Sequence, residues 1–250
     1  MSAKAILVWG LHTVEAALRL APGDALELWV REDLQDEEAD GLVALARGAG
    51  VKPQRVNKAT LDRLSGNAVH QGVLLRRRLP AGQELPDLLA TLDPATNPLL
   101  LVLDQIQDPH NLGACLRVAD GAGAQAVIVT RDRSASLSPT VAKVASGAVD
   151  SVPLVAVTNL ARALEALKEA GLWVVGASHD APDTIYTADL ARPLALVLGA
   201  EGRGLRRLTR EHCDGLVRIP MQGRVASLNL STAAAVCLFE ARRQLAARGG

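Results

Sequence analysis

An asparagine and an arginine stand six residues apart in the segment LDQIQDPHNLGACLR, residues 103–117. Its DPHN tetrapeptide has the composition of a turn, and Asn111 is suited to cap a helix that continues through Arg117. Six residues are nearly two helical turns, so we expect the two side chains on overlapping faces. Arg117 lies in an apolar run, where a partly buried guanidinium needs an anionic partner. That partner is either Asp120, three residues on, or a phosphate or developing oxyanion.

A glycine-rich turn lies in LALVLGAEGRGLRRLTREH, residues 194–212. A buried strand is predicted to end at Gly199, the turn carries Glu201, and a helix is predicted to open near Gly204. Ligands of open α/β sheets bind at such strand-to-helix edges. The glycine order matches neither the dinucleotide nor the Walker pattern, which disfavours phosphate transfer. Four arginines at the spacing of one helix face favour a bound polyanion over mere solubility: Arg203, Arg206, Arg207 and Arg210.

The third polar cluster lies in VRIPMQGRVASLNLSTAAAVCLFEA, residues 217–241. A strand leads through a turn at Gly223 to Ser227 and Asn229, and a long helix is predicted from about Asn229 to Ala247. One of the two polar residues is expected to cap that helix. The cluster holds more polar side chains than capping requires, and the surplus favours a ligand.

These segments belong to a chain with the composition of a globular protein. It has 250 residues, 49% hydrophobic and 22% charged, and no apolar run long enough for a membrane span. Its start has no signal-peptide pattern, so we expect a cytoplasmic protein. Three cysteines without Cys-x-x-Cys spacing argue against a disulfide framework and against structural zinc. Only five aromatic residues occur, so we do not expect a nucleic acid to be held here mainly by base stacking.

The net charge is zero, but the charges are unevenly placed. Residues 201–250 carry 9 basic and 4 acidic side chains. A second basic run is Arg76, Arg77 and Arg78. Such runs are either solvated surface or contacts to a polyanion.

Strands and helices alternate along the chain, which predicts an α/β protein. A small α/β domain is expected over 1–78 and a proline-rich linker over 79–98. From 99 to 250, apolar strands separated by amphipathic helices predict a mostly parallel sheet covered on both faces. Cys237 falls on an apolar helix stripe and is expected to be a packed hydrophobe. Gly121-x-Gly123 resembles a dinucleotide fingerprint but ends a helix, so it is expected to be a helix stop.

The three segments DPHNLGACLRVADGAG, LVLGAEGRGLRRLTREHCD and IPMQGRVASLNLSTAAAVCLFEA, in this order, resemble the three motifs of the SPOUT class of RNA methyltransferases, in its TrmH-type ribose 2'-O branch. The likeness extends to GLHTVEAAL and AVHQGVLL and so covers nearly the whole chain. It is strongest to members that methylate a guanosine in bacterial 23S ribosomal RNA.

The resemblance implies a C-terminal α/β domain tied as a trefoil knot and an N-terminal RNA-binding domain similar to the L30e and L7Ae fold. It implies S-adenosylmethionine held by loop backbone at positions matching Gly199, Ile219 and Leu228. It also implies a homodimer with its active site at the subunit interface. No metal is expected for methyl transfer, because the leaving sulfur becomes neutral. The family's other active-site positions match Asn111, Arg117, Glu201, Ser227 and Asn229.

Arg117 is expected to stabilise the developing oxyanion rather than to act as a base, because guanidinium stays protonated at neutral pH. The basic run at 76–78 and the arginines from 203 to 210 are expected to contact RNA phosphates. Two alternatives stay open: a non-catalytic RNA-binding or ribosome-assembly protein, and a methyltransferase that acts on another RNA such as transfer RNA.

Overall fold

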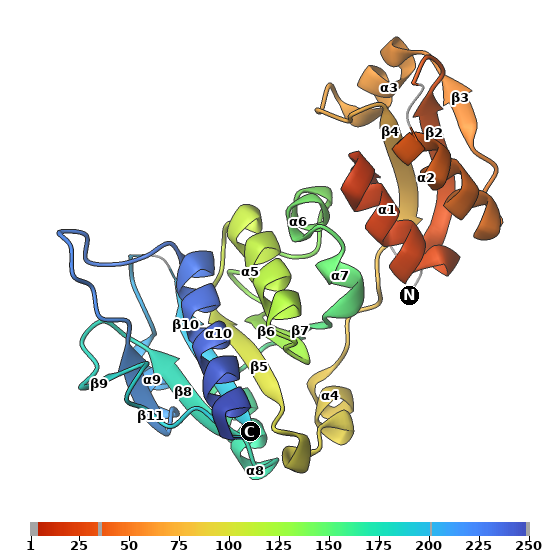
Figure 1. The fold of residues 1–250 in the computed structure, drawn as a ribbon. Coiled ribbons are helices and arrows are strands. Elements are labelled where there is room, and N and C mark those ends of the chain that lie inside the picture. The colour runs from red at the N-terminus through yellow and green to blue at the C-terminus, as the bar shows by residue number, and fades with distance from the viewer. Residues whose placement is uncertain (1–4, 35–36, 201, 249–250) are drawn as a thin grey trace. The chain divides into compact units, whose positions relative to one another are not determined.

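The computed structural model describes residues 5–34, 37–200 and 202–248, and its contacts divide the chain into two compact units. The smaller unit comprises residues 1–81 and 137–151, and the larger comprises 82–136 and 152–250. Figure 1 shows the helices and strands of both. The predicted linker, 79–98, therefore starts in the smaller unit and ends in the larger one. The domain boundaries themselves stay a prediction.

The smaller unit is built on a mixed four-stranded sheet in the order β1-β4-β2-β3. Its central strand β4 is antiparallel to both β1 and β2, whereas β2 and β3 are parallel. The strands are β1 (Ala5–Trp9), β2 (Ala25–Arg31), β3 (Gln54–Val56) and β4 (Val73–Arg78). The helices of the same segment are α1 (Leu11–Leu20), α2 (Glu37–Gly48) and α3 (Lys58–Ser65), with a 3-10 turn at Pro22–Asp24. The core is aliphatic, with Leu28, Val30 and Leu74 fully buried.

Two short helices of the smaller unit come from the segment 137–151. The segment SPTVAKVASGAVD, residues 138–150, predicts a single helix, but the structure has α6 (Pro139–Ala145) and α7 (Ala148–Ser151). The break lies at Ser146 and Gly147, whose φ angles are 50° and 98°. Left-handed backbone ends a helix, and a Cβ on Gly147 would lie 2.5 Å from the Cβ of Ala16. The prediction of a single helix was wrong because this contact with α1 cannot be read from local spacing.

The larger unit contains a seven-stranded sheet in the order β7-β6-β5-β10-β8-β11-β9, and every pair in it is parallel. Its strands are β5 (Leu99–Asp104), β6 (Ala126–Thr130), β7 (Leu154–Val157), β8 (Trp173–Ala177), β9 (Asp183–Thr184), β10 (Leu194–Gly199) and β11 (Gly215–Arg218). The central strands β5 and β10 are almost continuously aliphatic, as buried parallel strands are. The parallel sheet predicted from the sequence is confirmed.

Helices cover both faces of this sheet. The helices are α4 (Leu85–Thr91), α5 (Pro109–Gly121), α8 (Leu160–Glu169), α9 (Arg207–Glu211) and α10 (Leu230–Arg248), with a 3-10 turn at Pro94–Thr96. On one face α4 and α8 pack over the side chains of β5, β6 and β7. On the other, α5 and α10 lie side by side (Figure 1) and pack against each other. The spacing of four residues predicts one apolar helix stripe: Leu160, Ala163, Leu164 and Leu167. All four are buried, which confirms α8 as a core helix.

The carboxyl ends of β5, β10, β8 and β11 meet at one edge of the sheet, because these neighbouring strands are parallel. Asp104 at the end of β5 is in register with Gly199 at the end of β10. Ala177 at the end of β8 is in register with Val217 in β11. The three polar segments singled out in the sequence all leave strands or enter helices at this edge.

Candidate active site

Asn111 lies in the first turn of α5, not at its cap. Asp108 is the N-cap residue, and its carboxylate accepts a hydrogen bond of 2.9 Å from the backbone N–H of His110. Pro109 follows at the first helical position, where its missing N–H costs nothing. The prediction that Asn111 caps α5 was therefore wrong, because Asp108 already does so. Asn111 is instead buried, with 8% of its surface exposed.

A hydrogen bond joins Asn111 to the third polar segment across 118 residues of sequence. Asn229 Nδ2 donates to Asn111 Oδ1 at 2.9 Å. Asn229 Oδ1 in turn accepts from the backbone N–H and the hydroxyl of Ser231, at 2.9 and 2.7 Å. Asn229 is thus the residue that caps α10, one of the two that the sequence offered. The first and third segments meet here as neighbours.

Arg117 projects from α5 to solvent. Helix α5 buries Leu112, Cys115, Leu116 and Ala119, and Arg117 lies outside that face and is exposed. The expected partial burial was wrong. Among the residues that the structure describes, Arg117 forms no hydrogen bond or ion pair, with Asp120 or with any other residue. Its guanidinium is therefore available to an anion brought from outside these residues.

The glycine-rich turn after β10 folds back onto the end of its own strand. Gly204 N donates to Ala200 O at 2.9 Å, and these two residues form an isolated bridge. A Cβ on Gly199 would lie 2.0 Å from the carbonyl carbon of Gly204, so only glycine fits. Gly202 and Gly204 have φ angles of 73° and 64°. The expected active-site residue Glu201 lies outside the described residues.

The four arginines in and after this turn do not form a helical stripe. Helix α9 starts only at Arg207, so Arg203 lies in the turn and Arg206 is the residue before the helix. The predicted helix from Gly204 was wrong, because Arg206 is drawn into a bond with buried Asp104. Arg207 pairs with Glu211 on the same helix. Arg203 is exposed.

Arg210 holds the loop that follows β8, which the sequence analysis did not single out. Its guanidinium bonds both carboxylate oxygens of Asp180, at 3.0 and 3.1 Å, and the Ser178 hydroxyl at 2.8 Å. These contacts, led by Arg210, hold the pKa of Asp180 well below its ordinary value of 3.8. The sequence feature that could have identified this loop is Ser178, which directly follows a strand that neighbours β10.

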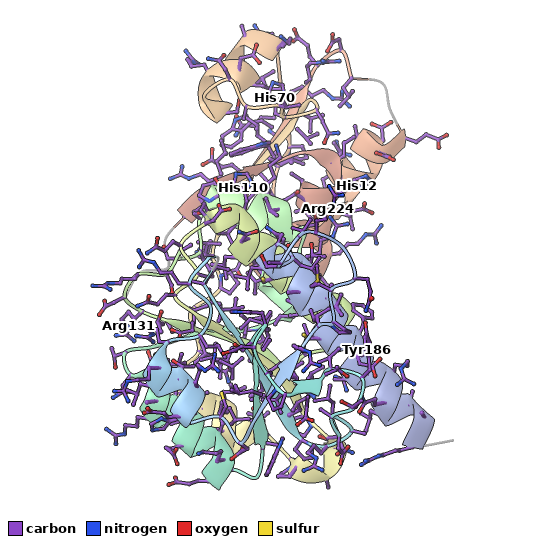
Figure 2. All side chains as sticks on the ribbon, turned by 90° about the vertical axis from the view of Figure 1, so that its left-hand side faces the viewer. His12, His70, His110, Arg131, Tyr186 and Arg224 are labelled. Carbon is purple, nitrogen blue, oxygen red and sulfur yellow. The ribbon has the colours of Figure 1, made fainter. Side chains whose placement is uncertain are left out.

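The third segment returns to the same edge of the sheet through β11. Ile219 follows the strand directly, and Ile219 and Leu228 are both half-buried. Ser227 and Arg224 are exposed between them. Figure 2 labels Arg224 on this loop and His110 at the start of α5, both at the end of the larger unit where α5 and α10 begin. Asn111, Gly199, Ile219, Leu228 and Asn229 therefore belong to one edge of one sheet.

The basic run in β4 alternates between exposure and burial, as a strand requires. Arg76 and Arg78 are exposed, and they bond Glu27 Oε1 at 2.9 Å and Gly23 O at 3.3 Å. Arg77 is 2% exposed and makes a bidentate pair with Asp150, at 2.6 and 2.5 Å. This pair occupies the guanidinium within the smaller unit, so the expectation that Arg77 contacts RNA was wrong.

Cys213 and Cys237 have no features of reactive groups. Burial raises the pKa of the Cys237 thiol to about 12, as expected for a packed side chain. Desolvation likewise raises the pKa of Cys213 to about 12. Across residues 5–34, 37–200 and 202–248, no three His, Cys, Asp or Glu side chains gather as metal ligands do. In the same ranges, no helix is both long and apolar enough to cross a membrane.

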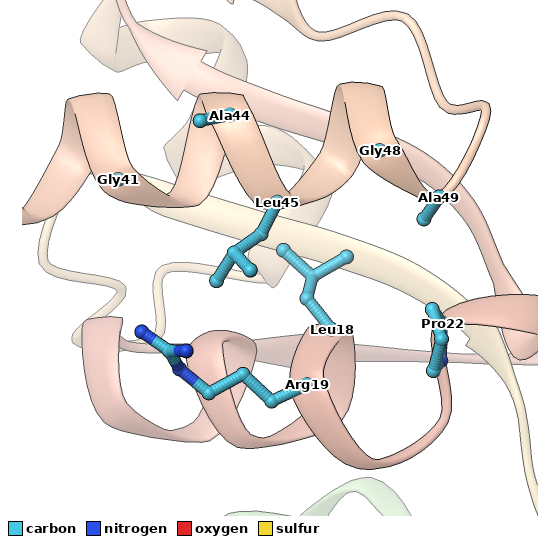
Figure 3. A pocket seen from close by; sticks show the side chains of 8 residues that line it. All are labelled: Leu18, Arg19, Pro22, Gly41, Ala44, Leu45, Gly48 and Ala49. Atoms are coloured by element: carbon cyan, nitrogen blue, oxygen red, sulfur yellow. The ribbon is translucent and has the colours of Figure 1, made fainter.

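A hollow between α1 and α2 differs in character from the edge just described. Figure 3 shows its lining, which is small or apolar apart from one guanidinium: Leu18, Arg19, Pro22, Gly41, Ala44, Leu45, Gly48 and Ala49. Arg19 is itself paired with Glu15 at 2.9 Å. The hollow brings together none of the polar groups that catalysis would need.

Comparison with known families and proteins identifies both parts of the chain. Residues 98–239 match the family model described as SpoU rRNA Methylase family, and residues 7–80 match RNA 2'-O ribose methyltransferase substrate binding. The chain is 50% identical over 242 residues to 23S rRNA (guanosine-2'-O-)-methyltransferase RlmB of Escherichia coli strain K12. That match covers 95% of this chain and 98% of the relative.

Solved structures show the same fold. A crystal structure of an RNA 2'-O ribose methyltransferase superposes with a TM-score of 0.80 at 32% identity, over 97% of this chain and 90% of that one. The AdoMet-bound rRNA methyltransferase of Sinorhizobium meliloti superposes with a TM-score of 0.79 at 27% identity, over 96% and 88%. The resemblance seen in the three sequence motifs is confirmed.

Proposed function

The chain belongs to the SpoU rRNA methylase family, and from this membership we propose that it transfers a methyl group from S-adenosylmethionine to the ribose 2'-hydroxyl of a guanosine in 23S ribosomal RNA. The substrate is supported by the near full-length identity to RlmB. The observation in the structure that carries the proposal is the hydrogen bond between Asn229 and Asn111, which joins the first and third motif segments.

The residues at the sheet edge fit the methyl donor. Gly199 has no side chain, which allows the backbone of Gly204 to pack against it and leaves main-chain groups to line this edge of the sheet. Ile219 and Leu228 offer half-buried aliphatic side chains on either side of the third segment's loop. We therefore assign Gly199, Ile219 and Leu228 to cofactor binding. When bound, S-adenosylmethionine supplies a methyl group activated by its sulfonium charge.

Arg117 is proposed to stabilise negative charge on the ribose 2'-oxygen or on its neighbouring phosphate. A guanidinium remains protonated at neutral pH, so it acts by charge and hydrogen bonding rather than by taking the proton. Its exposure and lack of a partner among the described residues leave its donors free for RNA. Asn111 and Asn229 are proposed to orient the ribose, together with Ser227 and Glu201.

Exposed arginines are proposed to hold the RNA backbone. Arg76 and Arg78 lie on the smaller unit, where the substrate-binding family model matches, and Arg203 lies in the turn after β10. Arg206, Arg207 and Arg210 pair with carboxylates, as Arg76 also does with Glu27, so the positive charge of each is partly neutralised. Arg77 is not part of this set.

A homodimer is proposed, with ribosomal RNA as its partner in the cytoplasm and with the catalytic domain tied in the knot typical of the family. Support for the dimer is that Phe239 on α10 is 51% exposed beside the C-terminal end of α5. Such an apolar side chain on paired helices fits a second copy of the chain. Sedimentation of the purified protein tests this proposal.

In vitro methylation tests the proposed function. The protein is incubated with S-adenosylmethionine and either 23S ribosomal RNA or transfer RNA, and the nucleosides are analysed by mass spectrometry. We expect 2'-O-methylguanosine in the ribosomal RNA alone. Product only in transfer RNA would change the substrate class, and a protein that binds RNA but no S-adenosylmethionine would be a non-catalytic assembly factor.

A further inference from the structure

Asp104 is a buried carboxylate that the proposed mechanism does not use. It ends the aliphatic strand β5, and only 1% of its surface is exposed. A carboxylate removed from water in this way must be satisfied by hydrogen bonds or by an opposite charge. Asp104 lies at the carboxyl edge of the sheet, where the motif segments meet, so its partners decide what it does there.

The partners of Asp104 all come from the start of α9. Asp104 Oδ1 accepts from Arg206 Nε and Nη2, each at 2.7 Å. Asp104 Oδ2 accepts from the Thr209 hydroxyl at 2.7 Å and from the backbone N–H of Arg206 at 3.3 Å. Thr209 is 2% exposed. Both carboxylate oxygens are therefore used to bind one short stretch of chain more than 100 residues away in sequence.

This arrangement fixes both ends of the glycine-rich turn from one residue. The turn leaves β10 at Gly199, which is the register partner of Asp104 in the parallel ladder. It rejoins the fold at Arg206, which the side chain of Asp104 binds. Between these ends, the contact of Gly204 with Ala200 closes the turn. Gly202 and Gly204 have no side chains that could stiffen it, so we expect its conformation to depend on the two fixed ends.

We propose that Asp104 is a positioning residue for the methyl-donor site, acting through the glycine-rich turn that it closes. The proposal rests on the proposed function, since Gly199 of that turn is assigned to S-adenosylmethionine. Asp104 does not touch the reacting atoms. Before the donor binds, the carboxylate of Asp104 already holds the turn in the conformation that binds the donor. Less of the binding free energy is therefore spent on ordering the turn.

Three substitutions separate this role from a general effect on folding. Asp104→Asn removes the charge at nearly constant size, and Thr209→Val removes one donor while leaving both shape and the Arg206 pair. Thr209→Ser keeps the hydroxyl and serves as the conservative rescue. The matched control is Asp189→Asn, because Asp189 also accepts from two arginines and a backbone N–H but lies away from the turn.

Two readouts are made on the full-length protein: hydrogen exchange without any cofactor, and calorimetric binding of S-adenosylmethionine. For Asp104→Asn we expect exchange in 202–206 to accelerate about tenfold while α10 is unchanged, and the dissociation constant to rise about tenfold, the size of one charged hydrogen bond. The turnover number at saturating donor should change by less than about threefold, because uniform binding is what is lost. Thr209→Val should shift both readouts in the same direction by about threefold, and Thr209→Ser and Asp189→Asn should match wild type.

The proposal is overturned if Thr209→Val binds the donor as wild type does and its exchange in 202–206 is unchanged. It is equally overturned if exchange in the variants rises evenly over the whole sheet, which would mean a structural role only. Should Asp104→Asn fail to fold, the comparison of Thr209→Val with Thr209→Ser still tests the proposal. If the wild-type protein binds no S-adenosylmethionine, the proposed function fails, and the exchange data alone show whether Asp104 holds the turn.

Discussion

Asn111 and Arg117 belong to the same helix but have different surroundings. Asn111 is buried and bonded to Asn229, whereas Arg117 is exposed. The sequence predicted both as site residues, but it could not predict their burial, because that depends on which face of α5 packs against the sheet and α10. The residue pattern marks the chemistry, and the neighbouring elements decide where each group points.

Replacing Arg117 by Ala is expected to lower the turnover number by at least about 100-fold, as is typical for the loss of an oxyanion donor. The dissociation constant for S-adenosylmethionine should stay within about twofold, because the donor is not held by this residue. Single-turnover methylation and calorimetry measure the two effects. Arg162→Ala, an exposed arginine on α8, is the matched control. Near-normal turnover in Arg117→Ala would remove this residue from the mechanism.

Asp189 gives a prediction for the dependence of stability on pH. Its bond with Arg192, helped by Arg248, lowers the pKa of its carboxyl to about 2 from an ordinary 3.8. A lowered pKa stabilises the folded state above about pH 4, and this contribution is lost as the pH falls through about 2. The free energy of unfolding of wild type should exceed that of Asp189→Asn by less than about 1 kcal/mol at neutral pH, since the pair is partly exposed.

Chemical denaturation at several pH values measures this difference. It should be constant from pH 7 to about pH 5 and shrink towards pH 2. A difference that grows with acidification would show that Asp189 is not stabilised as a carboxylate.

Helices α5 and α10 carry residues of the proposed site, so we expect the contacts between the two helices to matter for it. Asn229 joins α10 to the first turn of α5. At the other end of α5, Arg242 from α10 donates to Ala122 O at 2.6 Å and to Gly123 O at 2.5 Å. These carbonyls belong to the helix end, where a positive charge is favourable. The predicted stop at Gly123 is confirmed by its φ of 64°, but its arginine cap comes from a distant element.

We expect Arg242→Leu to lower the free energy of unfolding by about 1 to 2 kcal/mol, because it removes two charged hydrogen bonds at a helix C-terminus. Urea denaturation measures the loss. Arg243→Leu is the control, since Arg243 is more exposed and bonds Glu240 on its own helix. If both variants lose the same stability, the cap at α5 contributes nothing specific.

Elements that are determined by neighbouring residues in the sequence could be predicted, whereas those determined by distant residues could not. Strands β5 and β10 and helix α8 follow from apolar runs and helical spacing alone. Helix α9 is shorter than predicted because Asp104, about 100 residues earlier in the chain, binds Arg206 and holds it outside the helix. Asp104 could have been noticed as a charge at the end of an apolar run, but its partners could not.

The whole chain has a net charge of zero, but its arginines lie in very different surroundings. Arg77 and Arg206 are committed to buried carboxylates, whereas Arg76, Arg78 and Arg203 present charge at the surface. Counting charges along the sequence could not distinguish these groups. The family resemblance placed the function, and the structure divides the basic residues into those that hold the fold and those that can meet RNA.

RNA binding should weaken as salt rises. Each of Arg76→Ala, Arg78→Ala and Arg203→Ala is expected to reduce the slope of log affinity against log salt by about 0.7 to 0.9. Filter binding to a 23S fragment over a salt series measures these slopes, with Arg162→Ala as the control. Slopes unchanged in all three variants would contradict the proposed phosphate contacts.

We propose that this chain methylates a guanosine ribose in 23S ribosomal RNA and needs Arg117 to do so. To test this, 2'-O-methylation is mapped over the whole ribosomal RNA of a deletion strain, with the gene restored as wild type, as Arg117→Ala or as Arg162→Ala. We predict one guanosine in 23S RNA that loses its methyl group on deletion and regains it with wild type and Arg162→Ala only. An unchanged methylation map in the deletion strain would rule out the proposed activity, and full restoration by Arg117→Ala would rule out the proposed role of Arg117.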